Sequence, residues 1–447
     1  MRKIIAILCI LLSVQFVMAQ TKSYKRGLAL DQNKTTVADF KALAPSVTWF
    51  YNWSTSAKLD GNEEGIVFVP MTWNGGYNTN DLRNYLKNHP EVDYLLAFNE
   101  PNFKDQANMT PSQAAKAWPA LQAIADEFNL KLVSPAPNWC GWCVEENGTT
   151  YNSPYDWLRD FLKECKDCRV DYIGIHFYMG AMEAVKGSIE QLYNQFGKPI
   201  WLTEFNMDKN GMGDNGTVDE QRDFMVKMID WMEQDPRIYR YSWFLTRGGI
   251  LPDLMASTRG QLATLGKIYA HMSSYDTNYW HSIADRIEAE HYVRMSNLSL
   301  VESTDKDGNL SVGYTQAGSS LYYQIDVPAT GDYTLTLRTA GEQQAILQTS
   351  LDGKPIANIQ IPASGAWTNW QDIACTIPMT AGQHTLTLTW QSGSCDLNWI
   401  KLSNNTQQAI EQTQMQDNHP QPQKIIRNGQ LFIRHQNTEY DILGRRQ

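Results

Sequence analysis

Long hydrophobic runs are almost absent from this 447-residue chain. The exception is the apolar run from Ile4 to Val17, which follows Arg2 and Lys3 and precedes Met18-Ala19-Gln20. The run is short for a bilayer span, and its charged start and small final residue are typical of a signal peptide, with a buried N-terminal helix as the less favoured alternative. We therefore expect residues 1–19 to be a signal peptide, and a secreted or cell-surface protein without membrane insertion.

A surplus of positive charge is also lacking. The chain has 38 Lys and Arg against 48 Asp and Glu, which gives a formal net charge of −10. Nucleic-acid binding requires a basic face, so we expect no nucleic-acid partner. Aromatic residues are plentiful, with 15 Trp and 21 Tyr, and flat rings can stack on sugars. An aromatic-rich core would give the same counts, so the positions of these residues must decide.

Cysteine is scarce, and Cys9 falls within the expected signal peptide. The other six form two C-x-x-C pairs and one distant pair: Cys140 and Cys143, Cys165 and Cys168, Cys375 and Cys395. Two C-x-x-C pairs can hold zinc, but an oxidising compartment favours disulfides. Residues 153–164 predict a helix roughly 16 Å long that separates these pairs. We therefore predict two local disulfides, and Cys375 and Cys395 as candidates to pair with each other.

From residue 26 to 245 a short apolar run alternates with an amphipathic helical period. The eight predicted strands are Arg26–Asp31, Val47–Trp53, Ile66–Trp73, Tyr94–Glu100, Lys131–Pro137, Tyr172–Tyr178, Pro199–Phe205 and Ile238–Leu245. Runs without polar alternation are typical of parallel strands covered on both faces. Eight strands, each followed by a helix, predict the α/β class and a (β/α)₈ TIM barrel over residues 22–280. An open doubly wound sheet is disfavoured because no Gly-rich phosphate loop follows the first strand.

The pattern changes after about residue 279. Short alternating strands such as Tyr333–Arg338 and His384–Trp390, divided by turn sequences, predict an all-β jelly-roll sandwich over residues 285–402. The Gln- and Asn-rich residues 403–423 predict a linker. Residues 424–447 predict a short β-rich tail of two or three strands.

Two glutamates each close an apolar strand. Glu100 ends the fourth strand and Glu204 ends the seventh. A charge in such a place is costly unless it is partnered or useful, although one strand-end glutamate alone can simply be solvated. The reactive side chains of a (β/α)₈ enzyme gather at the C-terminal ends of the strands. Retaining glycoside hydrolysis requires two carboxyl groups ~5–5.5 Å apart, so Glu100 and Glu204 are the predicted catalytic pair.

Around these glutamates the sequence resembles clan A of the retaining glycoside hydrolases and, within it, glycoside hydrolase family 128. The matching motifs are Phe98–Asn102, Leu132–Ala136, Val170–Tyr178 and Trp201–Phe205, within a likeness spanning about residues 26–270. Members of that family act on β-1,3-glucans. The resemblance implies that Glu100 is the general acid/base and Glu204 the nucleophile.

The resemblance also implies roles for residues around the pair. Asn99 becomes the donor to the sugar 2-hydroxyl, and Tyr178 the aromatic that positions the nucleophile, with His176 beside it. Trp243 resembles the aromatic floor of the subsite for the attacked sugar. Trp53 and Trp73, at strand ends, are further candidate platforms. Barrel packing is the alternative for each tryptophan, and His176 can equally be a core histidine.

The region 287–402 resembles a family 6 carbohydrate-binding module. The matching motifs are Ile287–Glu290, Val312–Tyr314, Gly365–Trp367 with Trp370, Ala381–His384 and Leu397–Trp399. The resemblance implies a structural calcium ion on Glu288, Glu290 and Asn398, whose hard oxygen ligands suit that ion. It also implies a sugar cleft formed by Tyr314 and Trp367. The cleft's usual Asn is here Asp396, and a scaffold domain without sugar binding is the alternative.

These observations together predict a secreted, monomeric, retaining and endo-acting glycoside hydrolase that cleaves β-1,3-glucan and needs no cofactor for catalysis. The same chemistry on another β-linked glycan is the nearer alternative. An inactive barrel that serves as a glycan-binding surface protein is the alternative from another class. The tail motifs Leu431–Ile433 and Tyr440–Arg445 resemble the short sorting domains of a bacterial type IX secretion system.

Overall fold

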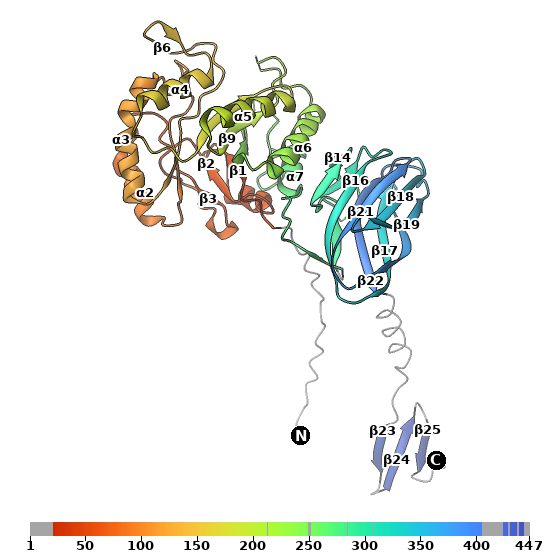
Figure 1. Cartoon of the computed structure of the whole chain (residues 1–447). Coiled ribbons are helices and arrows are strands. Elements are labelled where there is room, and N and C mark those ends of the chain that lie inside the picture. The colour runs from red at the N-terminus through yellow and green to blue at the C-terminus, as the bar shows by residue number, and fades with distance from the viewer. Residues whose placement is uncertain are drawn as a thin grey trace.

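The computed structural model describes residues 21–404, apart from 212, 249–251, 284 and 307, together with three short strands near the C-terminus. Two folded domains follow one another along the chain, an α/β domain and a sandwich of two β-sheets (Figure 1). The predicted α/β class and the β-rich C-terminal region are thereby confirmed. The predicted signal peptide and most of the predicted linker lie outside the described residues.

Eight parallel strands of the first domain lie at the positions that the sequence predicts. They are β1 (Arg26–Ala29), β2 (Trp49–Tyr51), β3 (Val67–Phe68), β4 (Tyr94–Leu96), β5 (Lys131–Val133), β8 (Ile173–Tyr178), β9 (Ile200–Asn206) and β10 (Ile238–Trp243). Six of them form one sheet in the order β3-β2-β1-β10-β9-β8, and β4 pairs with β5. Parallel bridges from Met71 to Leu96 and from Val133 to Tyr172 join the two groups. The eight strands therefore pair around a complete ring.

Helices lie on the outside of this ring (Figure 1). They are α1 (Val37–Leu43), α2 (Thr79–Asn88), α3 (Pro111–Glu127), α4 (Pro154–Glu164), α5 (Met182–Phe196), α6 (Val218–Gln234) and α7 (Thr264–His271). The predicted start of α4 is confirmed, because the Ser153 side chain accepts the backbone N–H of Asp156 and Pro154 occupies the first turn. A short hairpin of β6 (Glu145–Glu146) and β7 (Thr149–Thr150) precedes α4.

One part of the predicted repeat is wrong. Between β2 and β3 the described chain has only the 3₁₀ turn η1 (Asn62–Glu64), and not a full helix. Gly61 and Gly65 flank this turn, and Gly65 adopts a φ of 65°, in the left-handed region. The segment has no run of apolar residues at helical spacing, so no amphipathic helix could cover the ring here.

The interior of the ring is filled mainly by aromatic side chains. Trp49, Tyr51 and Trp201 are fully buried there with smaller apolar residues. Arg240 enters the same space, and its guanidinium carbon lies 4.5 Å from the ring centroid of Tyr94 and 5.0 Å from that of Trp201. Aromatic faces attract a cation, so the rings offset part of the cost of burying this charge.

The second domain consists of two six-stranded sheets. The first contains β11 (His281–Ser282), β13 (Arg294–Ser296), β16 (Ser320–Val327), β18 (Ala345–Leu351), β19 (Lys354–Ile361) and β21 (Gly382–Ser392). The second contains β12 (Arg286–Glu288), β14 (Ser299–Glu302), β15 (Leu310–Gly313), β17 (Gly331–Ala340), β20 (Gln371–Met379) and β22 (Asp396–Asn404). In β17 Tyr333, Leu335 and Leu337 are buried between partly exposed neighbours, as the alternating sequence predicts.

The two domains are packed against each other. β14 contacts both α6 and α7, which face the sandwich in Figure 1. Lys267 on α7 forms an ion pair with Glu302 on β14, and Ser273 donates a hydrogen bond to the backbone oxygen of Tyr292. One continuous apolar core contains residues of both domains, so the sandwich is docked on the first domain.

Near the C-terminus, β23 (Gln423–Arg427), β24 (Gln430–His435) and β25 (Thr438–Asp441) form an antiparallel sheet. This agrees with the two or three strands expected there. Within the described part of the chain, no helix is both long enough and apolar enough to span a membrane.

Candidate active site

The two predicted catalytic glutamates lie at the same end of the strand ring. Glu204 belongs to β9, whose seven residues are all buried, and Glu100 follows β4. A bridge between Asn99 and Ala136 continues the pairing of β4 with β5, and the Glu100 N–H donates to the Ala136 carbonyl at 3.0 Å. Glu100 has a φ of 41°, in the left-handed region. Such strained backbone is concentrated at functional sites, where surrounding contacts hold it.

Glu204 is held by three donors, two from the end of β2 and the loop that follows it and one from β8. Oε1 accepts the Tyr51 hydroxyl at 3.0 Å and the Trp53 indole N–H at 2.9 Å, and Oε2 accepts the Tyr178 hydroxyl at 2.5 Å. Tyr178 reaches Glu204 from the neighbouring strand, because β8 pairs with β9. Tyr51 and Trp53 reach it from further round the ring, because β1 and β10 lie between β2 and β9. Donors that point at a carboxylate stabilise its charged form and fix its orientation.

Glu100 is oriented through one of its two oxygens. The Asn138 amide donates to Oε1 at 3.1 Å, and His176 Nδ1 lies 3.1 Å from the same atom. His176 Nδ1 also lies 3.3 Å from Glu204 Oε2, so the imidazole bridges the two carboxylates. One oxygen of each carboxylate and one His176 nitrogen all lie within 4.8 Å of one another.

Burial and mutual charge shift the pKa values of this cluster. Burial, reinforced by Glu100, raises the pKa of Glu204, although His176, Tyr178 and Trp53 oppose the shift. Burial alone would lower the pKa of His176, but the negative charges of Glu204 and Glu100 outweigh it and raise the value. Burial and Glu204 hold the pKa of Tyr51 and Tyr178 well above the usual value, so both remain protonated donors.

The two glutamates line a pocket of about 630 Å³. Asn99, Trp53, Trp73 and Tyr178 line it with them, as predicted. The buried Oδ1 of Asn99 has no hydrogen-bond partner among the described residues, and its Nδ2 donates to Gln106 at 3.3 Å. An unpartnered buried amide oxygen beside the glutamates is available to a ligand hydroxyl.

The predicted placement of Trp243 in the pocket is wrong. Trp243 is fully buried, and its ring packs edge-on against Phe205, 5.1 Å between centroids, on the outer side of the ring of strands. Side chains alternate along a strand, so the next residue, Phe244, lines the pocket in its place. His176 does not line the pocket either, because it is buried behind the two carboxylates.

Tyr51 and Asn138 are functional candidates that the sequence analysis missed. Tyr51 ends the second strand, and its place at the C-terminal end of a barrel strand is the feature of the sequence that points to the active site. Asn138 follows the fifth strand, and its backbone is held by Asn102, whose Nδ2 donates to the Asn138 carbonyl at 2.7 Å. Asn102 ends the Phe98–Asn102 motif. This motif therefore also positions Asn138, which lies on the loop after the fifth strand.

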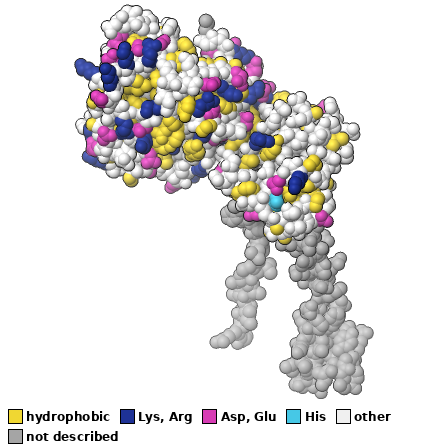
Figure 2. Space-filling view, in the orientation of Figure 1, with side chains coloured by type: hydrophobic (Ala, Val, Ile, Leu, Met, Phe, Trp, Pro, Cys, Tyr) yellow, Lys and Arg dark blue, Asp and Glu magenta, His cyan; other side chains and the backbone are white. Residues whose placement is uncertain are grey.

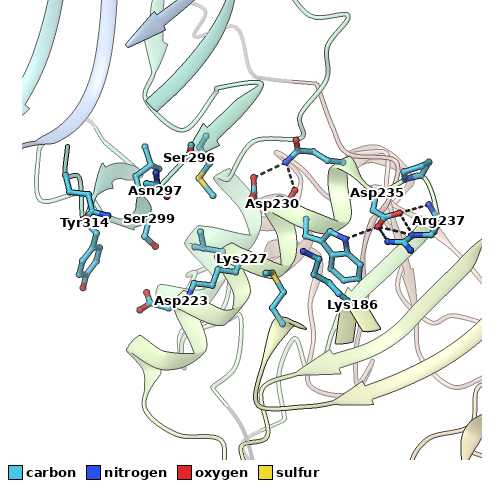
Figure 3. A pocket seen from close by; sticks show the side chains of 18 residues that line it. Lys186, Asp223, Lys227, Asp230, Asp235, Arg237, Ser296, Asn297, Ser299 and Tyr314 are labelled. Carbon is cyan, nitrogen blue, oxygen red and sulfur yellow. Dashed lines mark hydrogen bonds and ion pairs between the residues drawn. The ribbon is translucent and has the colours of Figure 1, made fainter. Parts of the chain in front are cut away.

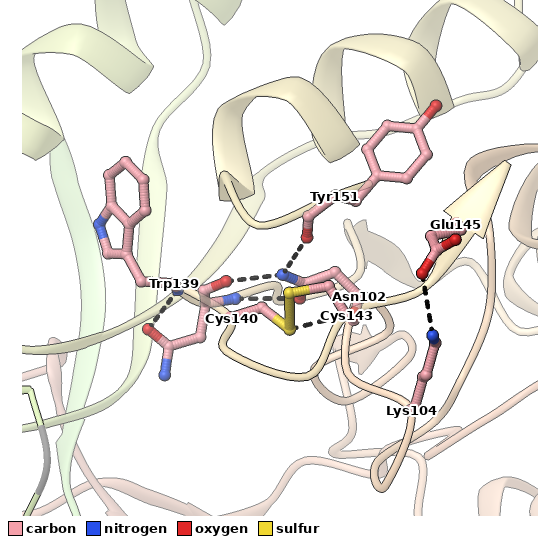
Figure 4. The surroundings of a disulfide bond; sticks show 8 residues. Asn102, Lys104, Trp139, Cys140, Cys143, Glu145 and Tyr151 are labelled. Atoms are coloured by element: carbon pink, nitrogen blue, oxygen red, sulfur yellow. Dashed lines mark hydrogen bonds and ion pairs between the residues drawn. A yellow bond between two sulfur atoms is a disulfide. The ribbon is translucent and has the colours of Figure 1, made fainter. Parts of the chain in front are cut away.

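The predicted disulfides Cys140–Cys143 and Cys165–Cys168 are both present, one at each end of α4. Figure 4 shows the first beside Asn102 and the ion pair of Lys104 with Glu145. This disulfide closes the loop that follows Asn138. The suggested pairing of Cys375 with Cys395 is wrong, because both thiols are free. Cys375 lies on β20, whereas Cys395 is buried and accepts the Trp390 indole N–H.

The predicted sugar-binding residues of the sandwich lie on loops or at a strand end. Tyr314 follows β15 and is 60 % exposed, and Trp367, between β19 and β20, is 37 % exposed. Asp396 begins β22, and burial raises its pKa to about 7. A Cβ on Gly313 would lie 3.1 Å from Asp396 Oδ1, which places this carboxyl beside the backbone that leads to Tyr314.

The predicted calcium ligands are buried near one another. Glu288 accepts hydrogen bonds from Arg286, and Glu290 has an Oε2 without a partner among the described residues. The Asn398 Nδ2 donates to Asp305 at 2.9 Å, and its buried Oδ1 has no described partner. Burial and Glu288 raise the pKa of Glu290 well above the usual value. Two buried oxygens without donors, beside a second carboxylate, fit a hard cation.

Comparison with known families assigns both domains. A family model described as the glycosyl hydrolase catalytic core matches residues 27–269, and a model of the family 6 carbohydrate-binding module matches residues 288–404. A solved endo-β-1,3-glucanase of glycoside hydrolase family 128, subgroup II, from Sorangium cellulosum is 36 % identical. That match covers 55 % of this chain and 97 % of the other, with a TM-score of 0.49. The matches confirm both resemblances found in the sequence.

Curated relatives are matched over only part of their length. Alkali-sensitive linkage protein 1 of Schizosaccharomyces pombe is 26 % identical over 256 residues, which is 55 % of this chain and 44 % of that protein. The clotting factor G alpha subunit of Tachypleus tridentatus is 28 % identical over 126 residues, which is 27 % of this chain and 19 % of that protein. The chain thus spans less than half the length of these two relatives.

Proposed function

The chain belongs to the glycosyl hydrolase catalytic core family, whose model spans residues 27–269, and from this premise we propose that it hydrolyses a β-glucan. The observation that carries the proposal is the placement of Glu100 and Glu204, with a carboxylate oxygen of each within 4.8 Å of the other, in a pocket of about 630 Å³. The closed ring of strands supports a (β/α)₈ barrel with one helix reduced to a 3₁₀ turn, and the paired sheets support a jelly roll.

We propose that hydrolysis retains the configuration of the anomeric carbon. Retaining enzymes hold their carboxyl groups ~5–5.5 Å apart, whereas inverting enzymes need ~6.5–9.5 Å to admit a water molecule. The short separation of Glu100 and Glu204 favours the first class. In this mechanism the nucleophile bonds to the anomeric carbon as the glycosidic bond breaks. Water then cleaves the resulting ester to the enzyme.

The hydrogen bonds around each glutamate support their separate roles. Tyr51, Trp53 and Tyr178 all donate to Glu204, which suits an ionised nucleophile. The donors to Glu100 both reach Oε1, which leaves Oε2 to carry a proton to the departing oxygen. After Glu204 is glycosylated its negative charge is gone. Glu100, now deprotonated, can take a proton from the attacking water.

The linkage is proposed from the resemblance in sequence. The motifs Phe98–Asn102, Val170–Tyr178 and Trp201–Phe205 resemble family 128, whose members act on β-1,3-glucans. Trp53, Trp73 and Phe244 offer apolar faces in the pocket, and Asn99 offers an amide. We propose β-1,3-glucan as the substrate, with internal cleavage of the chain. Another β-linked glycan remains the alternative.

For the sandwich we propose carbohydrate binding through Tyr314, Trp367 and Asp396, together with a structural calcium ion on Glu288, Glu290 and Asn398. The matched module family and two exposed aromatic rings support the first part. The unpartnered buried oxygens of Glu290 and Asn398 support the second. Catalysis itself requires no cofactor in this proposal. Export by the signal peptide, a monomeric state and sorting by the C-terminal tail remain predictions.

The test is hydrolysis of laminarin and curdlan by the full chain and by its Glu204→Gln variant. We expect oligosaccharides of several lengths from the parent and none from the variant, with NMR of the first product showing the β-anomer. A panel of defined β-1,4 and mixed-linkage oligosaccharides determines the linkage. Absence of product from the parent on every β-glucan would instead support an inactive glycan-binding protein.

A further inference from the structure

A groove of about 920 Å³ lies between the catalytic domain and the sandwich (Figure 3). Helices α5 and α6 contribute Lys186, Lys227 and Trp231, and the sandwich contributes Asn297, Gln316 and Tyr314. These residues do not line the active-site pocket. The volume lies within the range of ~300–1,000 Å³ that is typical of ligand sites.

Tyr314 stands at the edge of this groove (Figure 3). Its ring is exposed, yet its backbone is fixed, because the Thr315 hydroxyl donates to the Cys395 carbonyl at 2.9 Å and accepts the Cys395 N–H at 3.1 Å. Tyr314 itself has a φ of 53°, in the left-handed region. The contacts of Thr315 hold this strained turn in place, so Tyr314 leaves the sheet at a defined angle.

The catalytic domain contacts Tyr314 directly through Arg222 on α6. The Arg222 Nη2 donates to the Tyr314 hydroxyl at 3.1 Å, and its guanidinium carbon lies 5.4 Å from the ring centroid. Arg222 is itself held by Asp219 at 2.8 Å and Asp223 at 2.9 Å, and it is only 7 % exposed. A buried arginine therefore orients an aromatic ring that is otherwise open to solvent.

The chemistry of the groove suits a neutral, hydroxyl-rich ligand. Its charged lining residues are balanced, with three basic and three acidic side chains: Lys186, Lys227, Arg237, Asp223, Asp230 and Asp235. The Tyr314 hydroxyl accepts from Arg222 and so keeps its own proton for a ligand oxygen. The amides of Asn297 and Gln316 add further donors and acceptors. A phosphate or a metal ion would require an excess of one charge.

We propose that Tyr314 and Arg222 form the mouth of a carbohydrate-binding site shared by the two domains, with a glucan strand extending from Tyr314 into the groove. The inference rests on the proposed sugar binding by the sandwich, and it assigns α6 of the catalytic domain to the same site. Because Arg222 fixes the Tyr314 ring before the ligand arrives, the Tyr314 side chain loses less conformational entropy on binding.

The test measures binding of the full chain to insoluble curdlan. All proteins carry Glu204→Gln to prevent hydrolysis and Trp73→Ala to weaken binding in the active-site pocket. We expect Tyr314→Ala to weaken binding at least tenfold and Arg222→Ala about three- to tenfold, the range of one lost hydrogen bond. Tyr314→Phe keeps the ring and removes the hydroxyl that accepts from Arg222 and is proposed to donate to the ligand, so it should weaken binding about threefold. Asn297→Trp, which fills the groove, should also weaken binding.

Two matched controls separate this site from general surface effects. Arg159 on α4 forms the same ion pairs with Asp156 and Asp160, three residues before and one after. Among the described residues, no aromatic ring accepts a hydrogen bond from it or lies under its guanidinium. Tyr24 is 58 % exposed on the catalytic domain. Arg159→Ala and Tyr24→Ala should bind curdlan as the parent does, and the unfolding midpoint of each variant reports its folding.

Unchanged or tighter binding by folded Arg222→Ala and Tyr314→Phe would overturn the shared site, and so would unchanged binding by Asn297→Trp. If Trp367→Ala weakens binding while these variants do not, the sandwich binds sugar and only the shared site is wrong. If the parent does not bind curdlan at all, the proposed role of the sandwich fails together with it.

Discussion

The catalytic domain and the sandwich each contain a pair of glutamates that are buried or nearly so, and the surroundings of the two pairs differ. Glu204 accepts three hydrogen bonds and Glu100 is oriented by Asn138 and His176. In the sandwich, Glu288 pairs with Arg286, but Glu290 keeps a buried oxygen without a described partner. Protein side chains thus donate hydrogen bonds to both glutamates of the first pair, which we propose reacts with the substrate. In the second pair, Glu290 Oε2 receives no hydrogen bond from a described residue, and such an oxygen suits a bound cation.

The outer surfaces of the two domains differ as well. On the face shown in Figure 2, charged side chains of both signs are scattered over the catalytic domain and are fewer on the sandwich. A weakly charged surface suits contact with a neutral polymer. This difference agrees with the carbohydrate binding that we propose for the sandwich.

Loss of the nucleophile should have the largest effect. Glu204→Ala should lower kcat on laminarin by on the order of 10⁴-fold or more, because it removes the carboxylate that we propose attacks the anomeric carbon. Added azide should restore turnover and yield a glycosyl azide of inverted configuration, measured by NMR. Glu100→Ala should retain the first step on substrates with good leaving groups. If the two variants exchange these behaviours, the roles are assigned the wrong way round.

Removal of one donor to Glu204 should have a smaller effect. Tyr51→Phe should lower kcat roughly 10- to 100-fold, because a preorganised hydrogen bond to the nucleophile is lost. Tyr241→Phe is the matched control, since this buried tyrosine donates to Glu233 at 2.6 Å on the outer side of the ring. It should lower the unfolding temperature and leave kcat close to the parent value. Equal losses of kcat in both variants would show that Tyr51 acts only through stability.

The pH dependence of stability tests the junction between the domains. Burial lowers the pKa of His271 to about 4, with a contribution from Lys267, and of His291 to about 3, with contributions from His281 and His271. Burial also lowers the pKa of His281. At these three histidines the unfolded chain therefore binds more protons between about pH 3 and 6.5, so their contribution to stability is lost as pH falls through that window. Glu204, Glu290 and Asp396, whose pKa values burial raises, act in the opposite direction.

In a background that carries Glu204→Gln, Glu290→Gln and Asp396→Asn, which removes these opposing groups, we expect the unfolding midpoint to fall by roughly 5–10 °C between pH 7 and pH 5. The same scan on His281→Asn should show a smaller change. A midpoint that stays constant over this range would contradict the buried, neutral state of these histidines.

Calcium should have the smallest effect and should act only on the sandwich. Millimolar calcium should raise the unfolding midpoint by roughly 5 °C relative to a chelator, because binding to the folded state alone is stabilising. Glu290→Gln should abolish this difference. Glu302→Gln, which alters an acidic residue paired with Lys267 on the surface, should preserve it. Equal midpoints in calcium and chelator for the parent would exclude the ion.

Much of the fold could be predicted from periodicity. All eight strands of the ring and the helix α4 lie at predicted positions, because apolar runs and capped amphipathic segments depend on local sequence. The missing helix after β2 shows the limit of prediction from a repeat. The segment there has two glycines and no apolar stripe, so the regular alternation of strand and helix does not extend to it. Trp243 was misplaced because alternation along a strand does not tell which face is the inner one.

The sequence by itself determined the chemistry: two glutamates that end apolar strands, the motifs around them, and the two C-x-x-C pairs. Only the tertiary structure decided which donors reach Glu204, that Asn138 holds Glu100, and that Cys375 and Cys395 stay apart. It also decided that Arg222 meets Tyr314, 92 residues further along the chain. The physical reason is that strand and helix formation follow local patterns, whereas hydrogen bonds between distant residues depend on register and domain packing, which no local pattern specifies.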